Sequence, residues 1–383
     1  MNSDGFIEYV PAVVTPPGDT LKEALDEIGM TQAELAGRMG RPKKTINEIV
    51  RGKAAITHET ALQLERVLDI PAHFWRAMEE NYQQHLLRSR DLRLLEEQAD
   101  WLDEIPMASM VKEGWADAGN TAAENVANAL EFFGVASVDA FRDTFGSLVA
   151  AFRRSPSFQS DHWALAAWLR KGEIEARKLR CAPYSRKKLE AALAQARRLT
   201  VEEPAIALKQ LQEVCSKAGV AVVFVPELPN CAVSGAARWY GLRRAIIQLS
   251  FRHKRDDHVW FSFFHEAGHL LSSSPDDVFV DIPGEDAADE FARDYLIPPA
   301  AYAQFLSSVG GRNISHEAVR DFASEIEIAP GIVVGRLQHD GVIPYSHLNG
   351  LTVPISAETL EALWQQSMAV SRLDSMANLA QLT

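Results

Sequence analysis

The chain has 383 residues, of which 47% are hydrophobic and 24% charged, and its formal net charge is -13. This composition indicates a globular protein with enough chain for two or three domains. No stretch approaches the roughly 18 consecutive apolar residues of a membrane span, and we expect neither a membrane segment nor a secretory signal. Three widely spaced cysteines without a C-x-x-C pair favour a reduced, cytoplasmic protein. The acidic balance argues against attraction of the whole chain to nucleic acid, although a local basic surface remains compatible with it.

Residues 1–85 are predicted to form a helical domain. Helices are expected at 21–28, 32–39 and 42–50, with a fourth capped by Thr57 and a fifth starting at Pro71. Thr31 followed by Glu34 is the pattern of a capping box. The second and third helices are short, are joined by a glycine turn, and share a set of inward-facing apolar positions, which predicts a helix-turn-helix. Those positions are Leu35, Ala36, Ile46 and Ile49.

The same stretch is locally basic. Residues 38–53 contain six basic side chains and one acidic side chain, Glu48, which favours phosphate binding. The second helix of such a pair enters the major groove with its first residues. We therefore predict base contacts from Lys43, Lys44, Thr45 and Asn47 and phosphate contacts from Gln32, Arg41, Arg51 and Lys53. The alternative is a solvated basic helix in a protein-binding bundle.

Several segments of this domain resemble the HigA-type antitoxin branch of the XRE helix-turn-helix family. They are P-P-G at 16–18, T-Q-A-E-L-A at 31–36, K-T-I-N-E-I at 44–49, G-K at 52–53, I-T at 56–57, T-A-L at 60–62 and F-W at 74–75. Members of that family bind operators as dimers. The resemblance therefore implies a double-stranded DNA operator as partner and a homodimer as the binding form.

Residues 86–198 are predicted to be a helical middle region without a chemical motif. Helices are expected at 86–102, 122–133, 138–145 and 162–181. Between Arg170 and Arg198, ten basic residues stand against three acidic ones. A solvated helical face is the favoured interpretation, and a second nucleic-acid contact or a partner surface is the alternative.

Residues 199–350 contain an H-E-x-x-H motif. On a helix, His265 and His269 project from one face and can hold one Zn²⁺, with Glu266 beside them as a general base. The neighbouring aromatic and aliphatic residues predict that this helix is buried, and a metal would explain polar groups in such an element. A helix at 205–218 and strands at 220–225 and 245–249 are expected before it.

A catalytic zinc site needs a third protein ligand, which we expect from the next helix. Glu285 in its first turn is the predicted ligand, and Asp289 is the predicted acceptor for a ligand imidazole. Asp281, Asp286 and Glu290 remain competing carboxylates.

Residues from about 199 to 348 resemble the ImmA/IrrE family of metallopeptidases. The matching segments are A-I-I-Q-L-S at 245–250, residues 260–271, residues 285–298 and residues 318–349, which include P-G-I-V-V-G-R-L at 330–337. In that family the third ligand is a glutamate thirteen residues before the closing proline, which here is Glu285 before Pro298. This chain departs from the family in having Ala287 where most members carry a second acid. The resemblance implies regulated cleavage of a repressor or partner protein, as in stress or toxin–antitoxin circuits.

One further segment and two further residues of this region each have two interpretations. If the cleft is active, we expect residues 245–250 to hold an extended substrate as an edge strand, and a position inside the sheet is the alternative. Tyr240 is a weak candidate for stabilising an oxyanion and a better one for packing. Cys231 could regulate the cleft, but a buried inert thiol is the favoured interpretation.

The expected fold is a mainly α, multidomain chain: an all-α helix-turn-helix domain, a helical linker, an α+β zincin-like domain with a small sheet, and a C-terminal tail over 351–383. The expected function combines DNA binding with zinc-dependent peptide hydrolysis. In that reaction, Zn²⁺ held by His265, His269 and Glu285 activates water and Glu266 transfers its proton. The alternative function is a non-proteolytic DNA-binding antitoxin or repressor whose zinc domain senses a signal or binds a partner such as a toxin.

Overall fold

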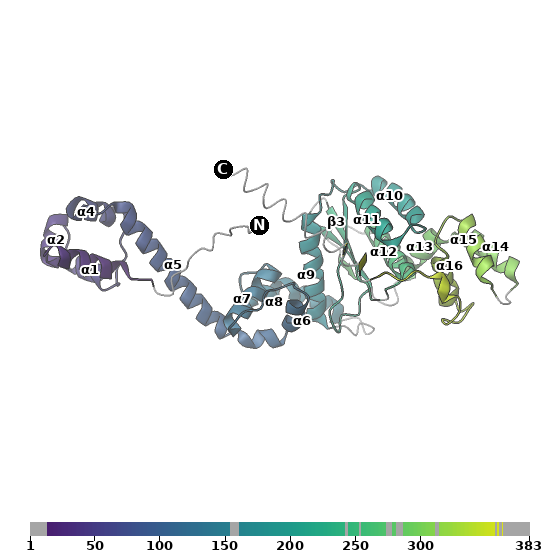
Figure 1. Cartoon of the computed structure of the whole chain (residues 1–383), viewed down its shortest axis with the longest axis horizontal. Coiled ribbons are helices and arrows are strands. Elements are labelled where there is room, and N and C mark those ends of the chain that lie inside the picture. The colour runs from purple at the N-terminus through teal and green to yellow at the C-terminus, as the bar shows by residue number, and fades with distance from the viewer. Residues whose placement is uncertain are drawn as a thin grey trace. The chain divides into compact units, whose positions relative to one another are not determined.

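A computed structural model describes residues 14–153, 161–241, 244–252, 254–272, 278–280, 286–310 and 314–356, together with 358, 359 and 362. The chain is mainly helical with one small sheet, as predicted (Figure 1). It divides into two compact units, one made of Met1–Ala99 with Gly119–Val126 and the other of Asp100–Ala118 with Ala127–Thr383. None of the described helices is long and apolar enough to cross a membrane.

The first unit contains the helices that the sequence predicts for a helix-turn-helix. They are α1 (Pro17–Glu27), α2 (Gln32–Met39), α3 (Lys43–Val50), α4 (His58–Leu68) and α5 (Ala72–Glu96). The four predicted inward positions of α2 and α3 are buried, in one cluster with Leu21, Leu64 and Trp75. The apolar periodicity of short helices therefore defines this core.

The ends of these helices follow local chemistry. The Thr31 hydroxyl accepts a hydrogen bond from Glu34 N at 3.2 Å, and Gly40 closes α2 with a φ of 64°. The side chain of Glu34 pairs with Arg38 at 2.7 Å. One of the two hydrogen bonds of the predicted capping box, from Glu34 N to the Thr31 hydroxyl, is therefore present. Thr57 caps α4 as predicted.

Helix α5 is longer than expected. The sequence predicts one helix starting at Pro71 and another over 86–102, but the structure has a single helix from Ala72 to Glu96 followed by a 3₁₀ turn at Ala99–Asp103. No glycine or proline interrupts residues 72–96, so the backbone hydrogen bonds continue across the proposed boundary at residue 85.

The remaining elements are a small sheet and further helices, of which α9, α11 and α12 contact the sheet. The helices are α6 (Met107–Lys112), α7 (Ala122–Phe133), α8 (Val138–Arg153), α9 (His162–Lys178), α10 (Arg186–Leu199), α11 (Pro204–Ser216), α12 (Asp256–Ser272), α13 (Asp286–Leu296), α14 (Pro299–Val309), α15 (His316–Glu325) and α16 (Pro330–His339), with a 3₁₀ turn at Asn349–Leu351. The strands are β1 (Val220–Phe224), β2 (Gly235–Tyr240), β3 (Arg244–Leu249) and β4 (Val278–Val280).

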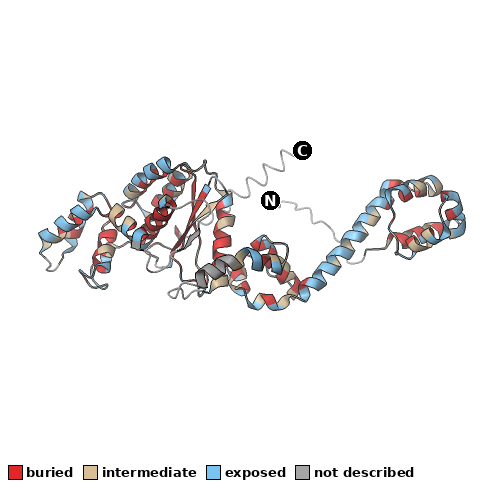
Figure 2. Cartoon of the chain, turned by 180° about the vertical axis from the view of Figure 1, so that it is seen from behind, coloured by how far each residue is buried: buried red, intermediate tan, exposed pale blue. Residues whose placement is uncertain are grey.

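The strand order is β1-β3-β2-β4, with β1 parallel to β3 and the other pairs antiparallel. Alternate residues of β3 face opposite sides of the sheet. Ile247 joins the core formed with α10, α11 and α12, whereas Gln248 donates a hydrogen bond to Trp168 O of α9 at 2.7 Å. Helices thus cover both faces, and the strands and their neighbours are largely buried (Figure 2).

The segment 245–250 is an interior strand. Residues Ala245–Leu249 pair with β1 on one side and with β2 on the other. Its backbone is therefore already hydrogen-bonded on both sides, and the expectation that this segment holds a substrate as an edge strand is wrong. The edges of the described sheet are β1 and β4.

Part of the basic middle stretch is buried. Arg170 and Lys171 of α9 are 9% and 7% exposed, because α9 covers the sheet. Lys171 lies 2.9 Å from Glu175, and burial lowers the pKa of its ammonium group. The predicted solvated face is therefore wrong for these two residues, whereas Arg186, Lys187, Lys188 and Arg198 are exposed on α10.

A prediction for the first unit concerns Gly18, at which α1 contacts α3. A Cβ at this buried position would lie 2.2 Å from Ile49 O and 2.7 Å from Val50 O. We expect Gly18→Ala to destabilise the unit by about 1–3 kcal/mol, the usual effect of overpacking. Hydrogen exchange of the amides of residues 17–75 in the full chain measures this change.

Gly37→Ala is the matched control. Gly37 is exposed within α2 and a Cβ there would meet nothing within 4 Å, so better helix propensity should stabilise the unit by up to about 1 kcal/mol. Equal protection of the two variants would contradict the proposed contact.

Candidate functional site

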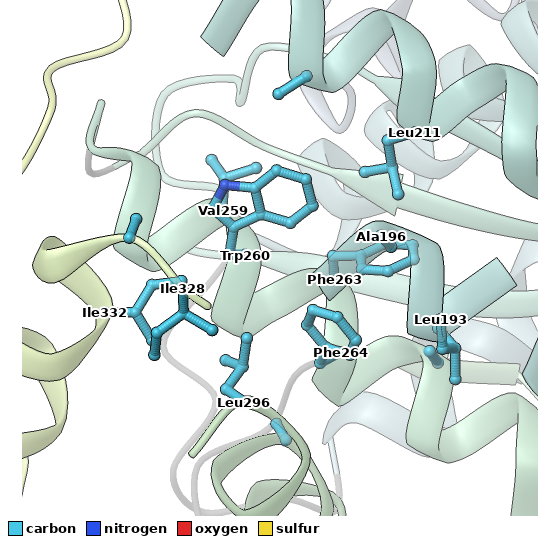
Figure 3. Packing of buried hydrophobic residues seen from close by; sticks show 14 of the residues in the cluster. Leu193, Ala196, Leu211, Val259, Trp260, Phe263, Phe264, Leu296, Ile328 and Ile332 are labelled. Atoms are coloured by element: carbon cyan, nitrogen blue, oxygen red, sulfur yellow. The ribbon is translucent and has the colours of Figure 1, made fainter. Parts of the chain in front are cut away.

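Helix α12 is the central helix of the second unit. Its aromatic residues Trp260, Phe263 and Phe264 pack against side chains from several other helices (Figure 3). Phe263 and Phe264 are fully buried. The polar residues that follow them on the same helix are therefore held in a largely apolar interior.

The two histidines of α12 face each other. His265 is 3% exposed and His269 is 8% exposed, and their Nε2 atoms lie 3.1 Å apart. Two nitrogens bound at 2.0–2.1 Å to one tetrahedral zinc ion lie about 3.3 Å apart. The structure therefore brings the two predicted ligands together at nearly the spacing that a shared metal ion requires.

Asp289 of α13 lies behind this pair. Its Oδ1 is 2.9 Å from Nδ1 of His265, and about a third of its side chain is exposed. When Nδ1–H donates to the carboxylate, Nε2 of His265 carries its lone pair towards His269. The contact is the one that the sequence predicts for Asp289.

Two glycines allow the close packing of this region. A Cβ at Gly268 would lie 2.9 Å from the ring of Phe291 on α13, and a Cβ at Gly235 would lie 2.6 Å from Oε1 of Glu266. Gly268 therefore lets α13 approach α12, and Gly235 lets β2 start directly against the Glu266 carboxylate. Neither glycine is among the residues predicted from the sequence, although Gly268, which lies between Glu266 and His269 in the motif, was a signal.

The predicted third ligand, Glu285, lies outside the described residues, as do Asp281 and the side chain of Asp286. Glu290 is exposed. In the described parts of the chain, no group of three or more His, Cys, Asp or Glu side chains is arranged to hold a metal. The two imidazoles and their aspartate are thus the described part of the candidate centre.

Two other candidates have packing roles. Tyr240 is at the opposite end of β2 from Gly235, about 17 Å along the strand, so it is too far from Glu266 to stabilise an oxyanion there. Its ring lies 5.7 Å from the guanidinium of Arg177. Cys231 is 2% exposed, and burial raises the pKa of its thiol to about 12, which makes it the inert thiol favoured by the sequence.

In the first unit, α3 presents polar residues to solvent. Lys43 and Lys44 are exposed, and the pair between Lys44 and Glu48 is 3.8 Å long and open to solvent. Thr45 and Asn47 are half-buried, and Asn47 Nδ2 donates to Gln32 Oε1 at 3.4 Å. The predicted base-contacting residues therefore share the outer part of one helix.

The predicted phosphate-binding residues differ in whether neighbouring side chains already bind them. Arg41 is bound to α4, because its guanidinium contacts Gln63 and lies 3.3 Å from Glu59. Arg51 and Lys53 are exposed, and none of the ion pairs found in the described chain involves them. Arg51 and Lys53 are thus freer than Arg41 to meet a phosphate.

Comparison with known sequences locates one family in the chain. A family model described as helix-turn-helix matches residues 21–75. The uncharacterized HTH-type transcriptional regulator YddM of Escherichia coli (strain K12) is 36% identical over 59 residues, which cover 15% of this chain and 63% of that protein. The chain therefore matches less than two thirds of the length of this curated relative.

Solved structures with local similarity include three bacterial proteins. Antitoxin HigA of Pseudomonas aeruginosa with the higBA promoter is 28% identical and is covered over 94% of its length, which is 22% of this chain, with a TM-score of 0.21. An addiction module antidote protein of the HigA family from Coxiella burnetii is 25% identical; the match covers 92% of that protein and 22% of this chain, with a TM-score of 0.21. PA4674 of P. aeruginosa in complex with its operator DNA is 27% identical; the match covers 96% of that protein and 23% of this chain, with a TM-score of 0.21.

With TM-scores this low, the sequence matches alone carry the assignment. The matched residues contain α2, the Gly40 turn and α3, whose apolar sides form the core of the first unit. The first unit of the chain thus carries an XRE-family helix-turn-helix domain.

Proposed function

We propose that the chain is a DNA-binding transcriptional regulator, of the antitoxin-like kind, which also contains a zinc-dependent endopeptidase domain that cleaves a repressor or partner protein. The DNA-binding part rests on the helix-turn-helix match and on the exposed cations of α3. The peptidase part rests on one observation, the facing Nε2 atoms of His265 and His269 with Asp289 behind them.

The surface of α3 supports operator binding. Lys43 and Lys44 at its start can reach base-edge acceptors in the major groove, and Asn47 one turn later can contact adenine. Arg51 and Lys53 follow the helix and suit phosphate contacts. A homodimer would present two copies of α3 to a two-fold symmetric operator.

The buried motif of α12 supports peptide hydrolysis. His265 and His269 would hold zinc with Glu285 as the proposed third ligand, and Asp289 would keep the His265 tautomer fixed. Zinc, when bound, supplies Lewis acidity that polarises a carbonyl group and activates water. Glu266, next to His265 and fully buried, would accept the proton of the attacking water and pass it to the leaving amine.

Operator binding is tested with Lys44→Ala. Loss of one base contact should weaken binding by about 1–3 kcal/mol, or roughly fivefold to 150-fold. The probe is a DNA site selected from a random pool by the full chain, and fluorescence anisotropy measures affinity over a series of salt concentrations. Lys22→Ala, an exposed lysine on α1, is the control. Equal affinities of the two variants would reject the groove assignment.

Metal binding is tested by elemental analysis of the full chain after zinc is supplied. We expect one zinc per chain, none in His265→Ala, and about 10–100-fold weaker affinity in Asp289→Asn, because the imidazole loses its orienting acceptor. Glu290→Gln changes the exposed neighbour of Asp289 and should bind zinc normally. Zinc retained in His265→Ala, or absent from the wild type, would overturn the candidate centre.

Proteolysis is tested with Glu266→Gln on a peptide library analysed by mass spectrometry. Loss of the general base should lower the cleavage rate by about 10²–10⁴ while zinc remains bound. Cleavage unchanged in this variant would rule out Glu266 as the base. A wild-type chain that binds zinc and cleaves nothing would favour the non-proteolytic regulator.

A further inference from the structure

A cavity of about 240 Å³ lies in the second unit, between the first half of α12, the end of α13 and the helix α16. Most of its wall is apolar, with contributions from Phe261, Leu296, Ile297 and Ile332. A cavity of about 150 Å³ is enough to bind benzene, so this one has room for an aromatic or branched aliphatic group with a short polar end.

The charges in the wall are unbalanced. Arg255, Arg293 and Arg336 line the cavity, together with Asp257. Arg255 forms a bidentate pair with Asp257 at 2.9 and 3.0 Å, and Arg336 pairs with Asp340 at 2.7 Å. No acidic partner of Arg293 is found in the described part of the chain.

The hydrogen bonds of the guanidinium groups also indicate that the described part of the wall has too few acidic or accepting partners for its arginines. The Nε of Arg293 and the Nη1 of Arg336 are buried without a hydrogen-bond partner, as far as the described residues show. Both arginines are half-buried, and a buried guanidinium nitrogen without a hydrogen-bond acceptor is unfavourable unless a ligand supplies one. A carboxylate suits a guanidinium in charge and in hydrogen-bonding geometry.

The wall on the α16 side is held in place. Nε2 of the buried Gln338 donates to Tyr345 O, His347 O and Asn349 Oδ1, at 3.3, 2.9 and 2.9 Å. Tyr345 itself lines the cavity. The loop after α16 is thus fixed against the helix, so the cavity is pre-formed.

We propose that this cavity binds an apolar group that ends in a carboxylate, with Arg293 as the residue that meets the charge. Two sources share this chemistry: a free small carboxylic acid, and the carboxyl-terminal apolar residue of a polypeptide. The site lies beside the candidate zinc centre, because Phe261 precedes His265 by about one turn of α12 and Arg293 follows Asp289 by one turn of α13.

The test is binding of 3-phenylpropionate to the full chain, measured by isothermal titration calorimetry. We expect saturable binding, at least tenfold weaker binding of the uncharged 3-phenylpropanamide, and at least tenfold weaker binding of the acid to Arg293→Gln. Arg293→Lys should recover part of the loss, and Arg198→Gln, an exposed arginine on α10, should bind like the wild type.

Two further arms separate the sites and the sources. Binding should persist in His265→Ala, which distinguishes the cavity from the zinc centre and keeps this test independent of peptidase activity. A pentapeptide ending in phenylalanine, compared with its amidated form, tests the polypeptide source: tighter binding of the free carboxylate peptide than of 3-phenylpropionate identifies it, and weaker binding identifies a small acid.

The proposal is overturned if the acid and its amide bind the wild type equally, if neither the acid nor the peptide binds, or if binding is lost in His265→Ala. It is also overturned if a folded Arg293→Gln variant binds the acid like the wild type. The comparison of acid with amide uses only the wild type, so it decides the question even if Arg293→Gln does not fold.

Discussion

The constraint on which the second unit depends is the burial of α12. Its aromatic residues fill the space between the sheet and the surrounding helices, and the same burial takes His265, Glu266 and His269 out of water. Polar groups in such a position need partners from other elements. Asp289 supplies one from α13, and the close approaches at Gly268 and Gly235 bring α13 and β2 to the required distance.

The same helix also borders a second, chemically different space. Around His265 the surroundings suit a cation, because two imidazole nitrogens and a carboxylate converge there. One turn earlier, at Phe261, the wall is apolar and carries arginines, one of which lacks a described acidic partner. A ligand with an apolar body and a negative end suits that space, and this charge preference distinguishes the cavity from the proposed zinc centre.

The first unit divides its basic residues between structure and surface. Arg41 is used internally, since it joins the turn before α3 to α4 through Glu59 and Gln63. Lys43, Arg51 and Lys53 remain exposed, on or after α3. A count of charges along the sequence treats these residues alike, whereas in the structure Glu59 offsets the charge of Arg41 and the exposed cations contribute most to the local positive field.

Features that depend on residues close together in the chain could be predicted from the sequence. The bounds of α2, the helix-turn-helix core, the facing of His265 and His269, and the cap at Thr57 follow from helical periodicity and capping chemistry. The three-dimensional packing was needed to show that β3 lies inside the sheet, that Arg170 and Lys171 of α9 are buried, and that Arg293 lines an apolar cavity. These features are set by contacts between segments far apart in the chain, and neither strand order nor the burial of an individual cation leaves a local pattern from which it could be predicted.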